Sequence, residues 1–405
     1  MFSVFDLFPE IVNSMKQVTP SGSRRLRINL KPFQEFFASG SVGGIILLGT
    51  VVISLAIANS EWGTPFAAFL QTKAGIHTDG FHLSFTLLEW VNDGLMAIFF
   101  LLVGLEIKRE LVEGELSSLQ QASLPVFAAF GGAVLPAIIY FLLNGGEPTA
   151  AGWGIPMATD IAFAIGILSL LGDRVPASLK IFLAALAIVD DLIAILVIAV
   201  FYSSDIHFTY LATALALFGV LLGFNKLGVR SLAAYLIHHS GVHATIAGVL
   251  TALAIPTNEG SDESPLEKLE HFLTKPVNFL IMPVFALVNT NIRFEAGMTG
   301  GLTAPLGLGI LLGLFLGKPL GILLTSRLVV GLGWGTMPRN ARWRHLLGIG
   351  LLGGIGFTMS IFVALLSFND PHYQLTAKFA ILTASVLSGA AGYGVLRAWG
   401  KGQRA

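Results

Sequence analysis

Long apolar runs recur along almost the whole chain, and they limit it to folds in which such runs meet lipid or protein on every side. Most are of about 17–25 residues, the length that carries an α-helix across a bilayer, and none reads as a ten-residue alternating strand of a barrel. About twelve spans are expected, two of them short, near 41–59, 86–105, 122–143, 151–171, 178–202, 208–224, 231–239, 243–256, 276–290, 304–326, 346–367 and 376–398. The pattern predicts an all-α polytopic membrane protein.

Composition agrees with this class and excludes several others. Charged residues make 12% of the chain, about half of the roughly 25% found in soluble domains. The hydrophobic share of 54% argues against a disordered chain. A net charge of zero argues against nucleic acid as a partner, and the absence of cysteine excludes disulfides and thiolate chemistry.

The basic residues predict how the spans are oriented. With the N-terminus in the cytoplasm and alternating sides, 20 of the 24 Lys and Arg fall on the cytoplasmic side, 3 on the other and one, Lys318, inside a span. This bias predicts an even number of spans with both termini cytoplasmic. The expected divisions are a cytoplasmic or interfacial tail (1–40), a transmembrane domain (41–398) and a short cytoplasmic tail (399–405). The tail before residue 41 has no long apolar run, so it does not read as a signal peptide.

The first outer loop carries a hairpin signal. Residues 76–83 alternate apolar and polar side chains about Asp79-Gly80, a dipeptide that favours a two-residue turn. A short β-hairpin is therefore predicted, with an irregular loop as the alternative.

Four ionisable residues lie deep inside predicted spans: Asp160, Asp190, Asp191 and Lys318. Such groups are costly in lipid and mark function by default. Asp190 and Asp191 are adjacent in mid-span, about 100° apart on a helix, so one can face a cavity while the other contacts a neighbouring helix. Two carboxylates this close cannot both ionise cheaply, which suits a site that exchanges protons for a hard cation. The alternative is a buried, hydrogen-bonded acid pair.

Two spans are interrupted. Pro156, Thr159 and Asp160 break the span near 151–171, and a glycine-rich run, 353–356, breaks the span near 346–367. The two spans run in opposite directions, as in transporters with an inverted repeat. Asp160 can neutralise facing helix N-termini, and Lys318 can neutralise C-termini or pair with an aspartate. Alone, each break is also explained by a proline kink or a glycine packing face, and Lys318 by snorkelling.

Several long motifs, in order along the chain, resemble the bacterial NhaA Na⁺/H⁺ antiporters. The resemblance covers roughly residues 40–398 and rests on Asn92–Glu110, Ala158–Ala164, Ala185–Asp191, Ser240–Gly248, Gly317–Gly321 and Gly354–Phe362. NhaA antiporters are themselves a known example of inverted repeats with broken helices, so the paired interruptions and the resemblance count as one indication rather than two.

The resemblance implies roles for individual residues. Asp190 and Asp191 correspond to the cation and proton site, Thr159 and Asp160 to the unwound crossing, and Lys318 to its charge partner. Positions linked to pH response are Glu106, Arg109, Glu110, His243, Glu270 and His271, and Asp93 matches a position linked to pH response or transport. The alternatives without a functional role are a solvated helix end for Glu106 and Glu110 and a packing role for His243. Thr274 stands where the family can carry a further histidine, which bears on the pH range.

The predicted function is electrogenic export of Na⁺ or Li⁺ in exchange for imported protons, by alternating access and under pH regulation. No cofactor and no enzymatic activity are expected, and residues 75–83 are the expected homodimer contact. The main alternative is a proton-coupled transporter of another small solute. A channel would need a repeated filter, an intramembrane aspartyl protease would need a Gly-x-Gly-Asp motif on a separate helix, and an ATP-driven pump would need a Walker A motif; none of the three occurs in the sequence.

Overall fold

The structure is a computed structural model that describes residues 31–78, 81–202, 244–257, 264–295 and 297–399. Outside these ranges lie the predicted spans near 208–224 and 231–239, His243, and the two terminal tails apart from residues 31–40 and Trp399. The predicted domain boundaries stay predictions.

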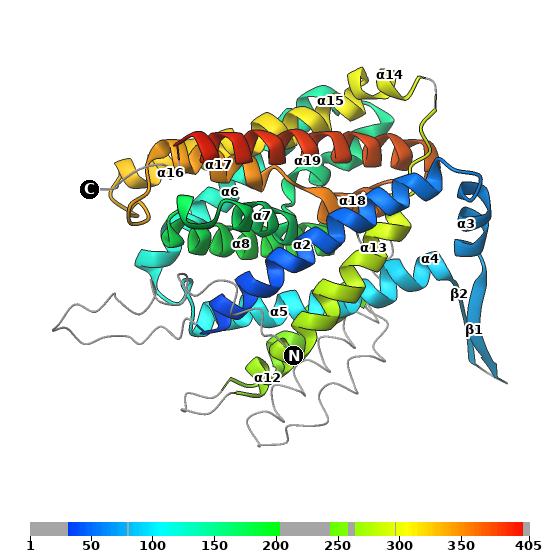
Figure 1. Cartoon of the computed structure of the whole chain (residues 1–405), viewed down its shortest axis with the longest axis horizontal. Helices are drawn as coiled ribbons and strands as arrows, with labels where there is room; N and C mark the ends of the chain where they lie inside the picture. The colour runs from blue at the N-terminus through cyan, green and yellow to red at the C-terminus, as the bar shows by residue number, and fades with distance from the viewer. Residues whose placement is uncertain (1–30, 79–80, 203–243, 258–263, 296, 400–405) are drawn as a thin grey trace.

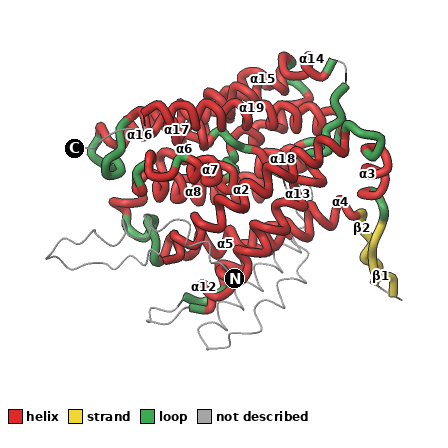
Figure 2. Tube along the Cα trace, in the orientation of Figure 1, coloured by secondary structure: helices red, strands yellow, loops and turns green. Residues whose placement is uncertain are grey.

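The described part of the chain is a bundle of helices with one small sheet (Figures 1 and 2). The first half contains α2 (Lys31–Ala58), α3 (Gly63–Leu70), β1 (Lys73–Thr78), β2 (Phe81–Thr86), α4 (Leu87–Glu89), η2 (Trp90–Leu95), α5 (Met96–Val112), α6 (Leu119–Asn144), η3 (Pro148–Met157), α7 (Ile161–Leu170), η4 (Gly172–Arg174) and α8 (Ala177–Phe201). The second half contains α11 (Ala244–Ala254), α12 (Pro265–Pro276), η5 (Val277–Ile281), α13 (Met282–Asn289), α14 (Met298–Thr303), α15 (Pro305–Leu312), η6 (Gly313–Gly317), α16 (Lys318–Gly331), α17 (Trp343–Gly353), α18 (Phe357–Ser367) and α19 (Pro371–Trp399).

Many of these helices are long and apolar enough to cross a bilayer. Among the described residues, five continuous helices meet that standard, and three pairs of helices bent at a short break bring the number of candidate spans to eight. The chain is therefore a multi-pass membrane protein in its described part. Twelve spans and the inverted repeat remain predictions.

Two helices begin well before the apolar runs that were predicted as spans. Helix α2 starts at Lys31, inside the segment assigned to the tail, and α12 starts at Pro265 instead of near residue 276. The start of α12 is fixed by a capping box, in which the Ser264 side chain accepts from the Glu267 N–H and Glu267 bonds back to the Ser264 N–H. A capped polar turn extends a helix beyond the apolar run that sequence reading detects.

The predicted hairpin is present. Strands β1 and β2 pair antiparallel with Thr78 opposite Phe81, which leaves a two-residue connection. The hairpin projects from one end of the bundle beside α3 (Figure 2). Helix α3 itself was not predicted; it turns 109° from α2.

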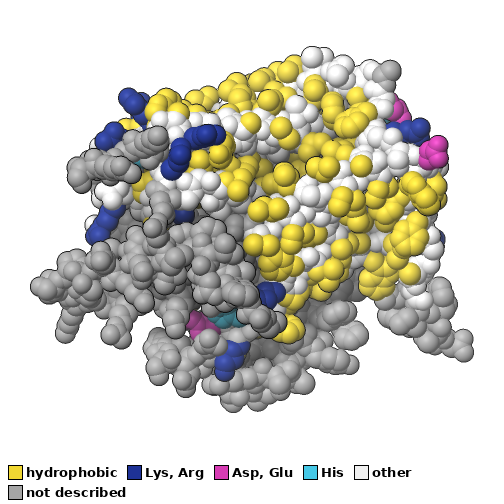
Figure 3. All heavy atoms as spheres, viewed as in Figure 1, with side chains coloured by type: hydrophobic (Ala, Val, Ile, Leu, Met, Phe, Trp, Pro, Cys, Tyr) yellow, Lys and Arg dark blue, Asp and Glu magenta, His cyan; other side chains and the backbone are white. Residues whose placement is uncertain are grey.

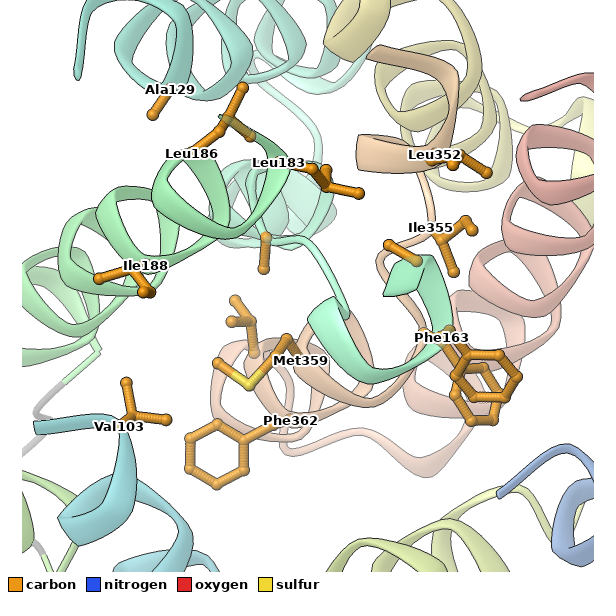
Figure 4. Close-up of a cluster of buried hydrophobic side chains, with 14 of the residues drawn as sticks. Val103, Ala129, Phe163, Leu183, Leu186, Ile188, Leu352, Ile355, Met359 and Phe362 are labelled. Carbon is orange, nitrogen blue, oxygen red and sulfur yellow. The ribbon is translucent and has the colours of Figure 1, made fainter. Parts of the chain in front are cut away.

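The face of the bundle in Figure 3 and the packing around helix α8 are both largely apolar. Hydrophobic side chains cover the middle of the face in Figure 3, while Lys and Arg gather mainly toward the end where the C-terminus lies. Helix α8 is the most enclosed of the five continuous candidate spans, with 72% of its apolar window buried against 39% for α6. Apolar side chains from α5, α6, α7, α8, α17 and α18 meet around it (Figure 4). The helix that carries Asp190 and Asp191 is thus shielded from lipid by its neighbours.

Candidate functional site

Two broken helices meet at the centre of the bundle. The pair η3 and α7 bends by 42° and the pair α17 and α18 by 46°. Across the breaks the Asp160 N–H donates to the Ile355 carbonyl at 2.6 Å, and the Thr159 hydroxyl donates to the Gly353 carbonyl at 2.8 Å. Each break therefore satisfies backbone groups of the other, which is the condition for irregular backbone at membrane depth.

Asp160 lies where two helices begin. One carboxylate oxygen accepts from the Phe163 N–H at 3.1 Å and caps α7. The other accepts from the Thr358 N–H at 3.1 Å and from the Thr358 hydroxyl, at the start of α18. Because a helix N-terminus carries partial positive charge, this one buried carboxylate neutralises two of them.

Lys318 is buried completely and contacts the facing elements. Its Nζ atom lies 2.5 Å from Asp190 Oδ2 and also donates to the Met157 carbonyl, at the end of η3. It therefore both pairs with an aspartate and compensates a helix C-terminus, and it does not snorkel to an interface. Helix α16 reaches this position because it packs closely on α6: a Cβ added at Gly321 would lie 2.1 Å from the Gly131 carbonyl oxygen.

Asp191 faces a different environment from Asp190. It lines a cavity of about 30 Å³ together with Glu106, Thr159, Asp160 and other side chains of α5, η5 and α18, a volume that holds about one water-sized particle. Asp190 Oδ1 and Asp191 Oδ1 are buried without a hydrogen-bond partner in the described residues. Buried unpaired acceptors are rare and costly unless a proton, an ion or water reaches them.

A second charged cluster joins α5 to α12. Arg109 Nε lies 3.0 Å from Glu270 Oε2, and Arg109 Nη2 lies 3.4 Å from Glu110 Oε1. Glu106 and Glu110 are only 9% and 1% exposed, so the alternative of a solvated helix end is wrong for both. Glu106 also lines the cavity beside Asp191, which connects the cluster to the aspartate pair.

Not every predicted residue joins these groups. Asp93 is exposed on η2, and neither it nor His271 lines the cavity. His271 is exposed on α12, Thr274 donates to the Glu270 carbonyl within that helix, and His243 lies outside the described residues.

Sequence reasoning missed three residues. Thr358 lies within the motif Gly354–Phe362 but was assigned no role, yet it donates twice to Asp160. Lys108 was counted only as a cytoplasmic charge, yet its Nζ donates to the Leu253 and Ile255 carbonyls at 2.7 and 2.5 Å, at the end of α11. Asn278 lines the cavity, and as a polar side chain inside an apolar span it gave a signal that a search for ionisable groups passes over.

Crossed broken helices around buried, paired charges define a secondary transporter fold, and comparison with known proteins specifies which one. A family model described as Na⁺/H⁺ antiporter 1 matches residues 34–396. The chain is 63% identical to "Na(+)/H(+) antiporter NhaA 2" of Flavobacterium johnsoniae, over 93% of this chain and 95% of that protein. It is 51% identical to "Na(+)/H(+) antiporter NhaA" of Dechloromonas aromatica, over 90% of this chain and 95% of that protein. The chain belongs to the NhaA Na⁺/H⁺ antiporter family.

Proposed function

We propose that this protein exports Na⁺ or Li⁺ across the bacterial inner membrane in exchange for imported protons. The observation that carries the proposal is that two adjacent buried carboxylates have different surroundings. Asp190 is held by Lys318, while Asp191 offers an unpartnered oxygen to a small cavity. Membership in the antiporter family supplies the two transported ions.

Competition for the same oxygens provides the coupling. Hard alkali cations take oxygen ligands, and only an ionised carboxylate binds them well. A proton that binds to the same carboxylate neutralises it and so competes with the cation. A pair of carboxylates can carry two protons in one direction and one cation in the other, which makes the exchange electrogenic. The crossing of the two broken helices is the element proposed to change access between the two sides.

The size of the cavity favours an ion over a larger cargo. About 30 Å³ accommodates a dehydrated cation or one water molecule, but not an organic solute. A proton-coupled carrier of another solute would need a larger space beside the carboxylates.

The cluster of Arg109, Glu110 and Glu270 is proposed to bias the access equilibrium with pH, through its link to Glu106.

The test uses everted membrane vesicles from cells that lack their own Na⁺/H⁺ antiporters, with a fluorescent dye reporting the internal pH. Adding Na⁺ or Li⁺ should release protons from acidified vesicles, and K⁺ should not. A dependence of the rate on an imposed membrane potential is expected for electrogenic exchange. Vesicles that respond to no alkali cation would refute antiport, and a response only to organic solutes would favour the solute carrier.

A further inference from the structure

Three of the six polar residues that line the cavity beside Asp191 already make side-chain hydrogen bonds: Thr159, Asp160 and Thr358. Thr159 donates to the Gly353 carbonyl, and both oxygens of Asp160 accept from Phe163 and Thr358. These bonds hold the two broken helices together and fix the directions of the Thr159 and Asp160 side chains. In the described part of the chain, the polar cavity-lining side chains without a hydrogen bond are Glu106, Asp191 and Asn278.

Asn278 occupies an unusual position. It lies in η5, a short π-helical segment within the span formed by α12, η5 and α13, and such segments are frequent at functional sites. It is the polar residue in an otherwise apolar run, Val277–Phe285. It also approaches α2, where a Cβ added at Gly43 would lie 3.5 Å from Asn278 Cβ. The half-buried residue thus lines the cavity and also contacts α2.

We propose that the side-chain carbonyl oxygen of Asn278 is a neutral ligand for the alkali cation in the cavity, next to the carboxylate of Asp191. The inference rests on the proposed antiport and adds a binding residue to it. Carbonyl and carboxylate oxygens together suit hard cations. An amide oxygen differs from a carboxylate because it takes up no proton near neutral pH. Asn278 therefore contributes to cation affinity without taking part in the proton competition.

A cation ligand and a merely structural residue can be told apart by the effect of a substitution on the KM for Na⁺, the maximal rate and the pH profile. Replacing Asn278→Leu keeps the size of the side chain and removes the oxygen. The apparent KM for Na⁺ should rise about tenfold, as expected when one contact to a charged group is lost, with little change in the maximal rate. The pH profile at saturating Na⁺ should stay unchanged, because the titratable groups that line the cavity, Glu106, Asp160 and Asp191, all remain.

Two further variants complete the design. Asn278→Asp restores an oxygen and should return the KM for Na⁺ toward the wild-type value at alkaline pH. Leu280→Ala changes a side chain of the same π-helical segment that is 60% exposed and outside the cavity lining, so its KM should equal that of the wild type. Should Asn278→Leu fail to insert, Asn278→Ala also removes the oxygen.

Binding of radioactive Na⁺ to the purified protein in detergent keeps this inference distinct from antiport itself. Weaker Na⁺ binding by Asn278→Leu, with normal binding by Leu280→Ala, supports the ligand role. Equal binding by wild type and Asn278→Leu overturns it, and antiport stands if the vesicles still exchange ions. Loss of maximal rate with unchanged Na⁺ binding likewise overturns it. A wild-type protein that binds no Na⁺ refutes both.

Discussion

The carboxylate of Asp160 accepts a hydrogen bond from the Thr358 N–H at 3.1 Å, although the two residues are 198 positions apart. Asp160 begins α7 and Thr358 lies in the first turn of α18, so one anion caps two half-helices that cross at the centre of the bundle. Motion of either half-helix must carry or break this contact. The crossing therefore behaves as one electrostatic unit.

Removing the Asp160 carboxylate should lower stability more than removing one of its partners. Asp160→Ala uncaps both α7 and α18, whereas Thr358→Val loses only the hydroxyl contact and keeps the backbone one. Each cap contributes about 0.5–2 kcal/mol. The melting temperature in detergent should therefore fall most for Asp160→Ala, less for Asp160→Asn and least for Thr358→Val. An Asp160→Ala protein that melts like the wild type would show that the crossing does not depend on this anion.

Lys318→Ala should destabilise the protein strongly. Removing one partner of a buried ion pair leaves an uncompensated charge and costs about 3–5 kcal/mol. Lys318→Arg keeps the charge and should lower the melting temperature less. In the double variant Lys318→Ala with Asp190→Asn, the loss should be smaller than the sum of the single losses, because the orphaned charge is gone. Additive losses would mean that the pair of Lys318 and Asp190 is not coupled.

Asp191→Asn should abolish Na⁺-dependent proton movement while leaving insertion and melting near those of the wild type. The amide keeps the size of the side chain and removes the titratable anion that faces the cavity. Asp190→Asn should raise the apparent KM for Na⁺ at least as much as it slows turnover. Glu61→Gln, a neutralised carboxylate on the exposed surface, is the matched control and should transport normally. Normal transport by Asp191→Asn would move the binding site elsewhere.

Acid pH should raise the apparent KM for Na⁺ before it lowers the maximal rate, since protons and Na⁺ compete for the same carboxylates. Saturating Na⁺ should restore activity on the acid side if competition acts alone. A regulatory role of the cluster around Arg109 predicts a residual loss, which Glu270→Gln or His271→Ala shifts along the pH axis. The pH profiles of transport by the wild type and these two variants, measured at low and at saturating Na⁺, distinguish the two cases. If all profiles coincide at saturating Na⁺, the cluster is not a pH sensor.

Deleting residues 75–83 should yield monomers that still transport. The hairpin of β1 and β2 projects from the bundle, and a two-stranded sheet offers unpaired edges to a symmetry-related copy. None of the residues that pair with Lys318 or line the cavity lies in the deleted segment. Native mass measurement of the deletion variant beside the wild type reads the oligomeric state. A variant that stays dimeric would place the interface on another surface.

The sequence by itself determined the class of the protein and the depth of its charges. Hydrophobicity is a local property, so apolar run lengths predicted α6, α8 and α19 to within a few residues, except at the start of α19, and the alternation about Asp79-Gly80 predicted the hairpin. The cost of charge in lipid singled out Asp160, Asp190, Asp191 and Lys318 for the same local reason. Apolar run length did not reveal the capped polar turn with which α12 begins.

Only the tertiary structure decided which groups meet. Asp190 and Asp191 have identical side chains and adjacent positions, yet their surroundings differ. Asp190 pairs with Lys318, which is 128 residues away in the sequence, whereas Asp191 lines the cavity. The Thr358 contact to Asp160 and the place of Asn278 beside the cavity depend in the same way on how distant helices cross. Such contacts are set by the close packing of whole helices, including glycine approaches like that of Gly321 to Gly131, and no local pattern along the chain encodes them.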